Sequence, residues 1–222
     1  MLIQASMQLT PGIFALFYHY ALGKNSSAKA SNLCLYFILG TITFMATIWL
    51  LIYAFMFTVF YNNVDICLNF FPWLMAGIFL AESIASLFFY YRKGKFTTLF
   101  IRRSTAKSLS THADKAKSRS DAFILGFFSG VPELIFTLPL YIMSVTELMK
   151  INSPLRSLFI VAYIVISIIP LLTIHTLYRQ DYNLAKIEQI RIRFKPAIRI
   201  LISISFLILA IATISIGVLN HG

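Results

Sequence analysis

The chain has 222 residues, of which 59% are hydrophobic and only 12% are charged, and its formal net charge at pH 7 is +11. A soluble domain carries about a quarter charged residues, and no compact core of this size could bury so much apolar surface. These numbers exclude a soluble globular protein and make lipid the solvent for most of the chain. The sequence therefore predicts a polytopic membrane protein.

Six stretches are apolar enough to span a bilayer, for which a helix needs roughly 20 residues. In chain order they are 1–23, 30–64, 66–91, 122–146, 157–178 and 200–222. The third and fourth each contain one acid, Glu82 and Glu133 respectively, and the other four contain no Asp, Glu, Lys or Arg. The second is long for one helix and short for two, so we interpret it as one tilted or overlong span. The first shows neither a basic leader nor a convincing cleavage site, so we expect a retained helix rather than a signal peptide.

Basic residues gather in the connections that follow the first, third and fifth spans. Nine lie between Arg92 and Arg119 and six between Arg179 and Arg199, whereas only Lys150 and Arg156 follow the fourth span and none follows the second. Placing both termini outside puts 17 of the 19 Lys and Arg residues in the cytoplasm, as the positive-inside bias requires. This distribution argues against a nucleic-acid partner. It predicts an integral protein of the bacterial cytoplasmic (inner) membrane, N-out and C-out, with basic cytoplasmic loops.

The chain divides into two halves of three spans each, residues 1–91 and 121–222, joined by a basic cytoplasmic loop at 92–120. Three residues recur at offsets of 121 to 124 positions: Pro11 with Pro132, Pro72 with Pro196, and Tyr20 with Tyr141. An odd number of spans per half makes the second half enter the membrane upside down. We therefore predict an all-α membrane protein of six transmembrane helices in two inverted three-helix repeats, a recurrent plan of transporters.

The two large cytoplasmic loops differ in character. Residues 92–120 are polar and rich in Ser and Thr, and residues 179–199 have a more helical pattern with one apolar and one basic side. Both patterns suit the surface of an anionic bilayer, and a regulatory or partner-binding role stays open beside the reading as ordinary loops. His112 fits a solvated loop histidine.

Prolines stand in the middle of the first and fourth predicted spans, at Pro11-Gly12 and Pro132-Glu133. A proline inside a helix removes a backbone hydrogen bond, and in lipid such breaks persist where protein or a wet cavity surrounds them. Inverted halves would bring the two breaks together near the midplane, where exposed helix ends can hold a ligand. The alternative is a pair of kinks that only improve helix packing.

Glu82 and Glu133 are the acids expected deep in the hydrocarbon, where an ionised side chain costs roughly 2.5–3.5 kcal/mol. Each also has a structural alternative. Glu133 could bind the free amides of the helix that continues after Pro132. Glu82 has the small neighbours Ala81, Ser83, Ala85 and Ser86, so it could simply hydrogen-bond to a closely packed helix.

The candidate residues for substrate or ion binding are Pro11, Gly12, Pro132, Glu133 and Glu82, with His19, Tyr20 and Tyr141 as accessory residues. His19 and His175 fit interface anchors near the cytoplasmic ends of their spans. The sequence contains no HxxxH or CxxC pair, so it predicts no metal site and no cofactor. Cys34 and Cys67 open their spans at opposite faces, roughly 30 Å apart, too far for a disulfide within one chain.

Two stretches carry a resemblance to a known family, "QLTPGIFALFYHYALG" in the first span and "DAFILGFFSGVPELIFTLPLYI" in the fourth. With six spans and a basic central loop, the chain resembles the lysine exporter (LysE) superfamily in the broad sense, which includes thiol-electron conductors of the CcdA and DsbD type. In the thiol-conducting branch a cysteine follows each of these prolines. Here Gly12 and Glu133 stand there, so that route of electron transfer is closed. The exporter branches imply movement of small solutes.

The leading hypothesis is a secondary transporter or exporter of a small solute, such as an amino acid, an ion or a lipid-like molecule. It would work by alternating access around the two proline breaks, with Glu133 as the coupling or substrate-contacting carboxylate. The competing hypothesis is a non-transporting membrane subunit or scaffold for a partner protein, suggested by the long basic loop. A transmembrane redox protein ranks below both. No nucleophile–base pair supports an enzyme. Besides lipid and solute, a second copy of the chain or another membrane protein stays open as a partner.

Overall fold

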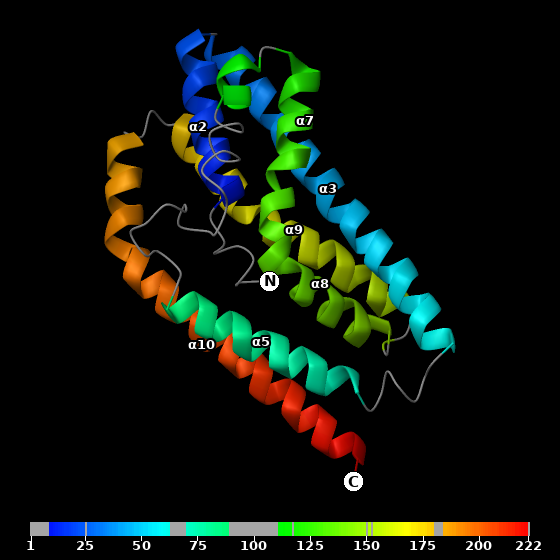
Figure 1. Cartoon of the computed structure of the whole chain (residues 1–222). Coiled ribbons are helices and arrows are strands. Elements are labelled where there is room, and N and C mark those ends of the chain that lie inside the picture. The colour runs from blue at the N-terminus through cyan, green and yellow to red at the C-terminus, as the bar shows by residue number, and fades with distance from the viewer. Residues whose placement is uncertain are drawn as a thin grey trace. The chain divides into compact units, whose positions relative to one another are not determined.

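The computed structural model describes residues 9–24, 26–62, 70–88, 111–116, 118–149, 151, 153–179 and 184–221. Its helices are α2 (Leu9–Lys24), α3 (Ser27–Asn62), α5 (Phe71–Phe88), α7 (Arg119–Ser129), the short 3-10 helix η1 (Val131–Glu133), α8 (Leu134–Met149), α9 (Ser153–Arg179) and α10 (Leu184–His221) (Figure 1). The described residues contain helices and no strand. The predicted all-α class is therefore confirmed for this part of the chain.

Within the part of the chain that the structure describes, four helices are long and apolar enough to cross a membrane: Ala28–Val59, Phe71–Phe88, Leu155–Leu177 and Ile200–Val218. A fifth span results if α7 with η1 and α8 are counted together as one broken span. The apolar part of α2, Ile13–Gly23, is shorter, and residues 1–8 of the first predicted span lie outside the described residues. A multi-pass helical membrane protein is thus supported, while the count of six spans, the repeats and the orientation stay predictions.

Two boundaries bear directly on the sequence predictions. The described part of the run 30–64 lies in a single helix of 36 residues, α3 (Ser27–Asn62), as the interpretation of one overlong span requires. The last span, predicted at 200–222, has its candidate membrane segment at Ile200–Val218, but its helix α10 begins earlier, at Leu184, and continues through Pro196. The apolar side predicted within 179–199 repeats with a helical period, so residues 184–199 can form one continuous helix with the span.

The chain forms two compact units, each built from both halves of the sequence. Unit 1 contains residues 1–47, 93–134 and 160–194, and unit 2 contains residues 48–92, 135–159 and 195–222. Helices α3, α9 and α10 each contribute one part to each unit. The two units are described separately below.

Unit 1 has an aromatic core between α2 and the first part of α3. Phe14 and Phe17 are fully buried and lie 5.2 Å and 5.7 Å, ring centroid to ring centroid, from Phe37. The buried residues of α2 and α3 recur every three or four positions, the spacing of one helix face. The core cluster also includes Ile13, Tyr18, Ala21, Ala30, Leu33, Cys34, Ile38, Ala113, Ala122, Leu125 and Leu171. Ala113 places the end of the predicted 92–120 loop on this core.

Two glycines let α3 and α7 approach backbone to backbone in unit 1, where the two helices run side by side (Figure 1). A Cβ added to Gly40 would collide with the carbonyl oxygen of Phe123, and a Cβ added to Gly126 would collide with the carbonyl oxygen of Phe37. At this contact the Thr41 hydroxyl lies 3.2 Å from the Gly126 carbonyl oxygen, to which it donates a hydrogen bond across the helices. Small residues at such a crossing are the usual means of close helix packing in membranes.

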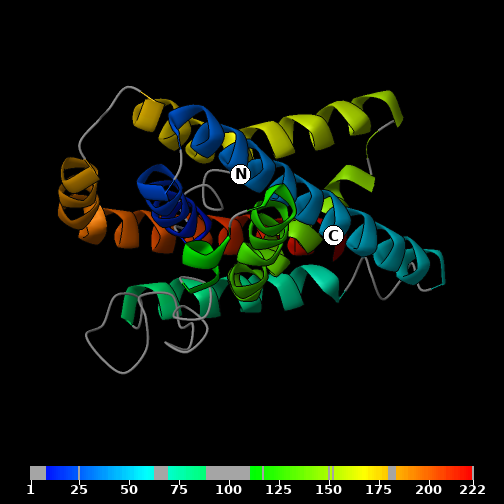
Figure 2. The same cartoon turned by 90° about the horizontal axis from the view of Figure 1, so that it is seen from above.

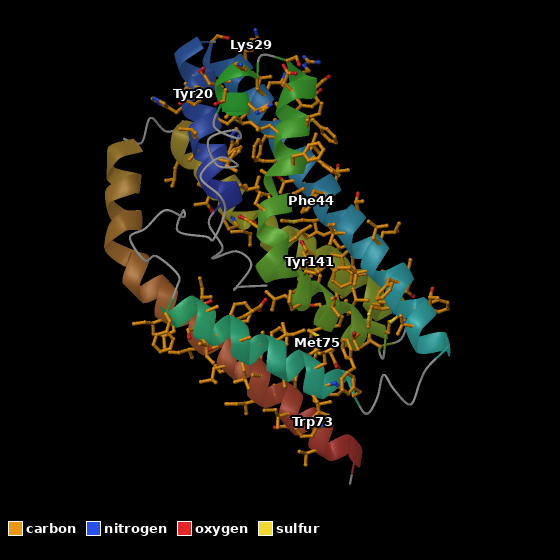
Figure 3. All side chains as sticks on the ribbon, viewed as in Figure 1. Tyr20, Lys29, Phe44, Trp73, Met75 and Tyr141 are labelled. Carbon is orange, nitrogen blue, oxygen red and sulfur yellow. The ribbon has the colours of Figure 1, made fainter. Side chains whose placement is uncertain are left out.

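In unit 2, α5 and α10 run antiparallel and side by side, as both views show (Figures 1 and 2). Phe79 stacks on Phe206 with 6.2 Å between ring centroids, and Trp73, labelled on α5 in Figure 3, packs near Gly217. Between the two helices, each of Ser83 and Ser203 donates a hydroxyl hydrogen bond to the other's backbone carbonyl at 2.9 Å. The small neighbours of Glu82 thus do permit close helix contact, as the sequence suggested.

The serine pair gives a first prediction. A double-mutant cycle of Ser83→Ala and Ser203→Ala should show a coupling free energy of about 0.6 kcal/mol, and no more than about 1.7, because hydrogen bonds between membrane helices are modest. The measurement is the free energy of unfolding in mixed micelles. Ser205→Ala is the matched control, since the Ser205 hydroxyl bonds only to Leu201 of its own helix. Additive losses from the two serines would contradict the prediction.

Arg156 hydrogen-bonds to the connection between α8 and α9 in unit 2. Its guanidinium donates to the carbonyl oxygens of Leu148, Met149 and Ile151 at 3.0–3.2 Å. It also donates to the Tyr53 hydroxyl of α3 at 2.8 Å and lies 5.9 Å from the centre of that ring. The last carbonyls of a helix have no partner within it, so this one cation satisfies the end of α8 and ties it to α3.

Candidate functional site

The predicted break in the fourth span is present and has a defined backbone. Helix α7 begins with a capping box, in which Ser118 and Asp121 exchange two hydrogen bonds of 3.0 Å, and it ends at Ser129. Gly130 leads into η1, which contains Pro132, and α8 begins one residue after Glu133. The Glu133 amide donates to the Gly130 carbonyl at 3.1 Å. At Pro132 the backbone thus forms a 3-10 turn, in which the amides of Glu133 and Leu134 donate to the carbonyls of Gly130 and Val131.

Glu133 is 9% exposed, so its side chain is buried in the protein rather than turned toward lipid. It directly precedes α8, where the free amides of a helix favour a negative charge. The position agrees with both interpretations drawn from the sequence, a capping role and a ligand-contacting role. Pro139, farther along, is buried inside α8, and the helix continues through it.

The surroundings of the first predicted break, at Pro11-Gly12, are described only in part. Pro11 and Gly12 lie in the first turn of α2 as described, and a proline in a first turn costs no intrahelical hydrogen bond. Helix α2 packs against α7 in unit 1, so the helix that carries Pro11 and Gly12 is in contact with the helix that leads into η1. The side-chain surroundings of Pro11 and Gly12 lie outside what is described.

The accessory residues belong to two units, His19 and Tyr20 to unit 1 and Tyr141 to unit 2. His19 is exposed and Tyr20 is half-buried, with 6.1 Å between their ring centroids. Figure 3 labels Tyr20 near Lys29, at the end of unit 1 where α7 begins. Tyr141 belongs to unit 2, where it is buried and packs edge-on against Trp49 with 6.4 Å between centroids.

Glu82 lies in α5, on the face that is buried in unit 2. This face contains Pro72, Met75, Ala76, Phe79, Glu82, Ser83 and Ser86. Glu82 is 9% exposed and Ser86 is fully buried. Among the described residues, neither Oε2 of Glu82 nor the Ser86 hydroxyl has a hydrogen-bond partner. A carboxylate oxygen and a hydroxyl thus lie buried one helical turn apart within a span.

Unit 1 holds a polar group that sequence reasoning missed. His175 was expected at the membrane interface, yet it is 7% exposed and packs edge-on against Tyr18 with 5.7 Å between ring centroids. Its Nε2 lies 3.5 Å from the Ser31 hydroxyl. The signal in the sequence was the helical spacing of apolar residues in α2, which includes Tyr18, but nothing in the sequence pairs that face with α9.

A groove of about 500 Å³ opens in unit 1 between the helical segment 111–115 and α7. Its lining combines polar side chains with apolar ones: His112, Lys115, Asp121, Ile124, Leu125 and Phe128. His112 is exposed, in agreement with the expected solvated histidine. The groove thus lies between the described end of the central loop and α7.

The described residues hold no group of three or more His, Cys, Asp or Glu side chains able to bind a metal ion. Cys34 is a free thiol buried in the core of unit 1, and Cys67 lies outside the described residues. No family model, curated protein or solved structure matches the chain.

Proposed function

We propose that the protein is a secondary transporter or exporter of a small solute, an amino acid, an ion or a lipid-like molecule. In this proposal six spans form two inverted triplets, with both termini outside and the basic loops in the cytoplasm. The two triplets alternate access to a site near the proline motifs of α2 and α7-η1. Substrate sites of such folds lie at interrupted helices.

One observation carries the proposal: a buried acid, Glu133, stands at a proline-containing helix break inside an apolar span. Acids within membrane spans are rare and mark solute or proton paths. One fact adds to it. Helix α2, which carries Pro11 and Gly12, packs against α7, the helix that leads into η1.

Transport by Glu133 variants tests the proposal. Purified protein in lipid vesicles is screened with labelled amino acids, Na⁺, K⁺ and a short-chain fluorescent phospholipid under an imposed pH gradient. Glu133→Gln and Glu133→Ala should slow movement of the transported solute about tenfold or more, equivalent to about 1.4 kcal/mol of lost interaction. The reason is that both remove the carboxylate at the helix break.

Glu147→Gln is the matched control, because Glu147 is a half-buried acid on α8 away from the break. It should leave the rate within about twofold, or about 0.4 kcal/mol. Full and equally pH-dependent transport by both Glu133 variants would remove Glu133 from the mechanism. Absence of movement for every solute class in the intact protein would argue against a transporter.

The second candidate is a membrane subunit or scaffold for a partner protein. The groove lined by Lys115 and Phe128 favours it, because the end of the basic loop is held on unit 1 and offers a polar and apolar surface together. A stable partner that is lost when residues 92–110 are deleted would support this function. Solute transport by the purified protein alone would count against it.

A further inference from the structure

The carboxyl group of Glu82 occupies an unusual position for an acid. It lies within the span Phe71–Phe88, on the face of α5 that carries Ser83 toward α10. Burying an ionised carboxylate in such a setting costs several kcal/mol unless a cation lies beside it or a proton binds to it and neutralises it. The question is which positive charge the surrounding residues could supply.

The span of the neighbouring helix supplies none, because Ile200–Val218 of α10 contains no ionisable side chain. Lys195 and Arg199 precede that span on α10, and the placement of their side chains lies outside what is described. Among the side chains described in unit 2, the other charged ones are Glu147 and Arg156, and the guanidinium of Arg156 is engaged with the end of α8 and with Tyr53. The hydroxyls of Ser83 and Ser203 already donate to backbone carbonyls.

The available oxygens suit a proton better than a metal cation. A hard cation seeks about six oxygen ligands, whereas the buried side-chain oxygens on this face of α5 that lack a partner among the described residues are one carboxylate oxygen of Glu82 and the hydroxyl of Ser86, a turn apart. A proton needs only the carboxylate oxygen, and the hydroxyl of Ser86 is spaced to hydrogen-bond the resulting carboxyl group.

We propose that Glu82, assisted by Ser86, is the proton-exchange site of the transporter. An O–H bond forms at the carboxylate with a proton taken from water on one side and breaks when that proton is released, so no electrons are transferred. The inference rests on the proposed function and assigns its coupling ion. It also divides the roles of the two buried acids, with Glu133 at the helix break facing the solute and Glu82 carrying the proton.

Infrared difference spectroscopy on the purified protein in lipid tests this without any solute. Between mildly acidic and mildly alkaline buffer, the protein should show a carboxyl C=O band that appears on acidification and shifts in D₂O. Glu82→Gln should abolish the band, Ser86→Ala should shift its frequency, and Glu147→Gln should leave it unchanged. The near-isosteric Glu82→Gln keeps the volume of the side chain, and retained near-ultraviolet circular dichroism shows that it folds.

Three results would overturn the assignment: no pH-dependent band that requires Glu82, a band that resists D₂O exchange, or a band that Na⁺ removes at constant pH. The last would identify a metal cation as the ligand. The spectroscopic result is separable from the function. A Glu82-dependent band in a protein that moves no solute would support the proton site and refute the transporter. Solute transport without the band would support the transporter and refute the proton site.

Discussion

Replacing Gly126 by leucine is expected to abolish the packing of α3 on α7 and to unfold unit 1. A Cβ at this position would collide with the Phe37 carbonyl oxygen and would lie 2.8 Å from the carbonyl carbon. Backbone atoms cannot move aside as the end of a flexible side chain can. Overpacking commonly costs about 1–3 kcal/mol, so Gly126→Ala should lose about 3 kcal/mol and Gly126→Leu should lose more.

Cys34 provides the measurement, because its thiol is buried in the core of unit 1 one helical turn before Phe37. In a Cys67→Ser background, the rate of maleimide labelling in lipid reports the opening of that core. Gly126→Ala should label faster than the parent, and Gly126→Leu should label fastest.

Gly77→Ala is the matched control for a glycine in a membrane helix. A Cβ at Gly77 meets no atom within 4 Å, so this variant should label no faster than the parent. Unchanged Cys34 protection in both Gly126 variants would show that α3 and α7 do not touch at this point.

The apolar runs predicted most of the fold that is described, because the length and composition of a span are local properties. Residues 30–64 were expected to form one helix, and the described residues of this run, up to Asn62, do so as α3. The crossing of α3 and α7 could not be predicted in the same way. Gly40 and Gly126 are far apart in sequence, and either glycine could equally have marked a loop or a contact with lipid.

The candidate site was predictable to the same degree. Pro132 signalled a helix break, and the structure has η1 at that position. The sequence could not distinguish the surroundings of Glu82 from those of Glu133, because the surroundings of Glu82 depend on which groups of α10 face α5. Small residues around Glu82 predicted close packing, and only the structure shows that Ser83 takes the available partner on α10 while Oε2 of Glu82 has none among the described residues.

Arg156→Ala should cost unit 2 about 2–4 kcal/mol of unfolding free energy, since hydrogen bonds from a charged donor are worth about 1.5–3 kcal/mol and several are lost together. The carbonyls of Leu148 and Met149 at the end of α8, the carbonyl of Ile151 and the Tyr53 hydroxyl all lose the guanidinium at once, and of these the Leu148 carbonyl keeps a bond from the Ile151 amide. Arg156→Lys should recover little of the loss, because an ammonium lacks the planar fork that reaches several acceptors. Tyr53→Phe removes a single bond and should cost about 1 kcal/mol.

Tryptophan fluorescence during denaturation measures these losses, because Trp49 and Trp73, the two tryptophans of the chain, both belong to unit 2. Arg119→Ala is the control, since the guanidinium of Arg119 is exposed and lies over the Tyr36 ring at 5.5 Å, a contact worth about 0.5–1 kcal/mol. Equal stability of Arg156→Ala and Arg119→Ala would contradict the role given to Arg156. A large loss would explain why a cation is kept in a connection that the positive-inside bias assigns to the outer face. Its charge there would serve the end of α8 rather than the orientation of the chain.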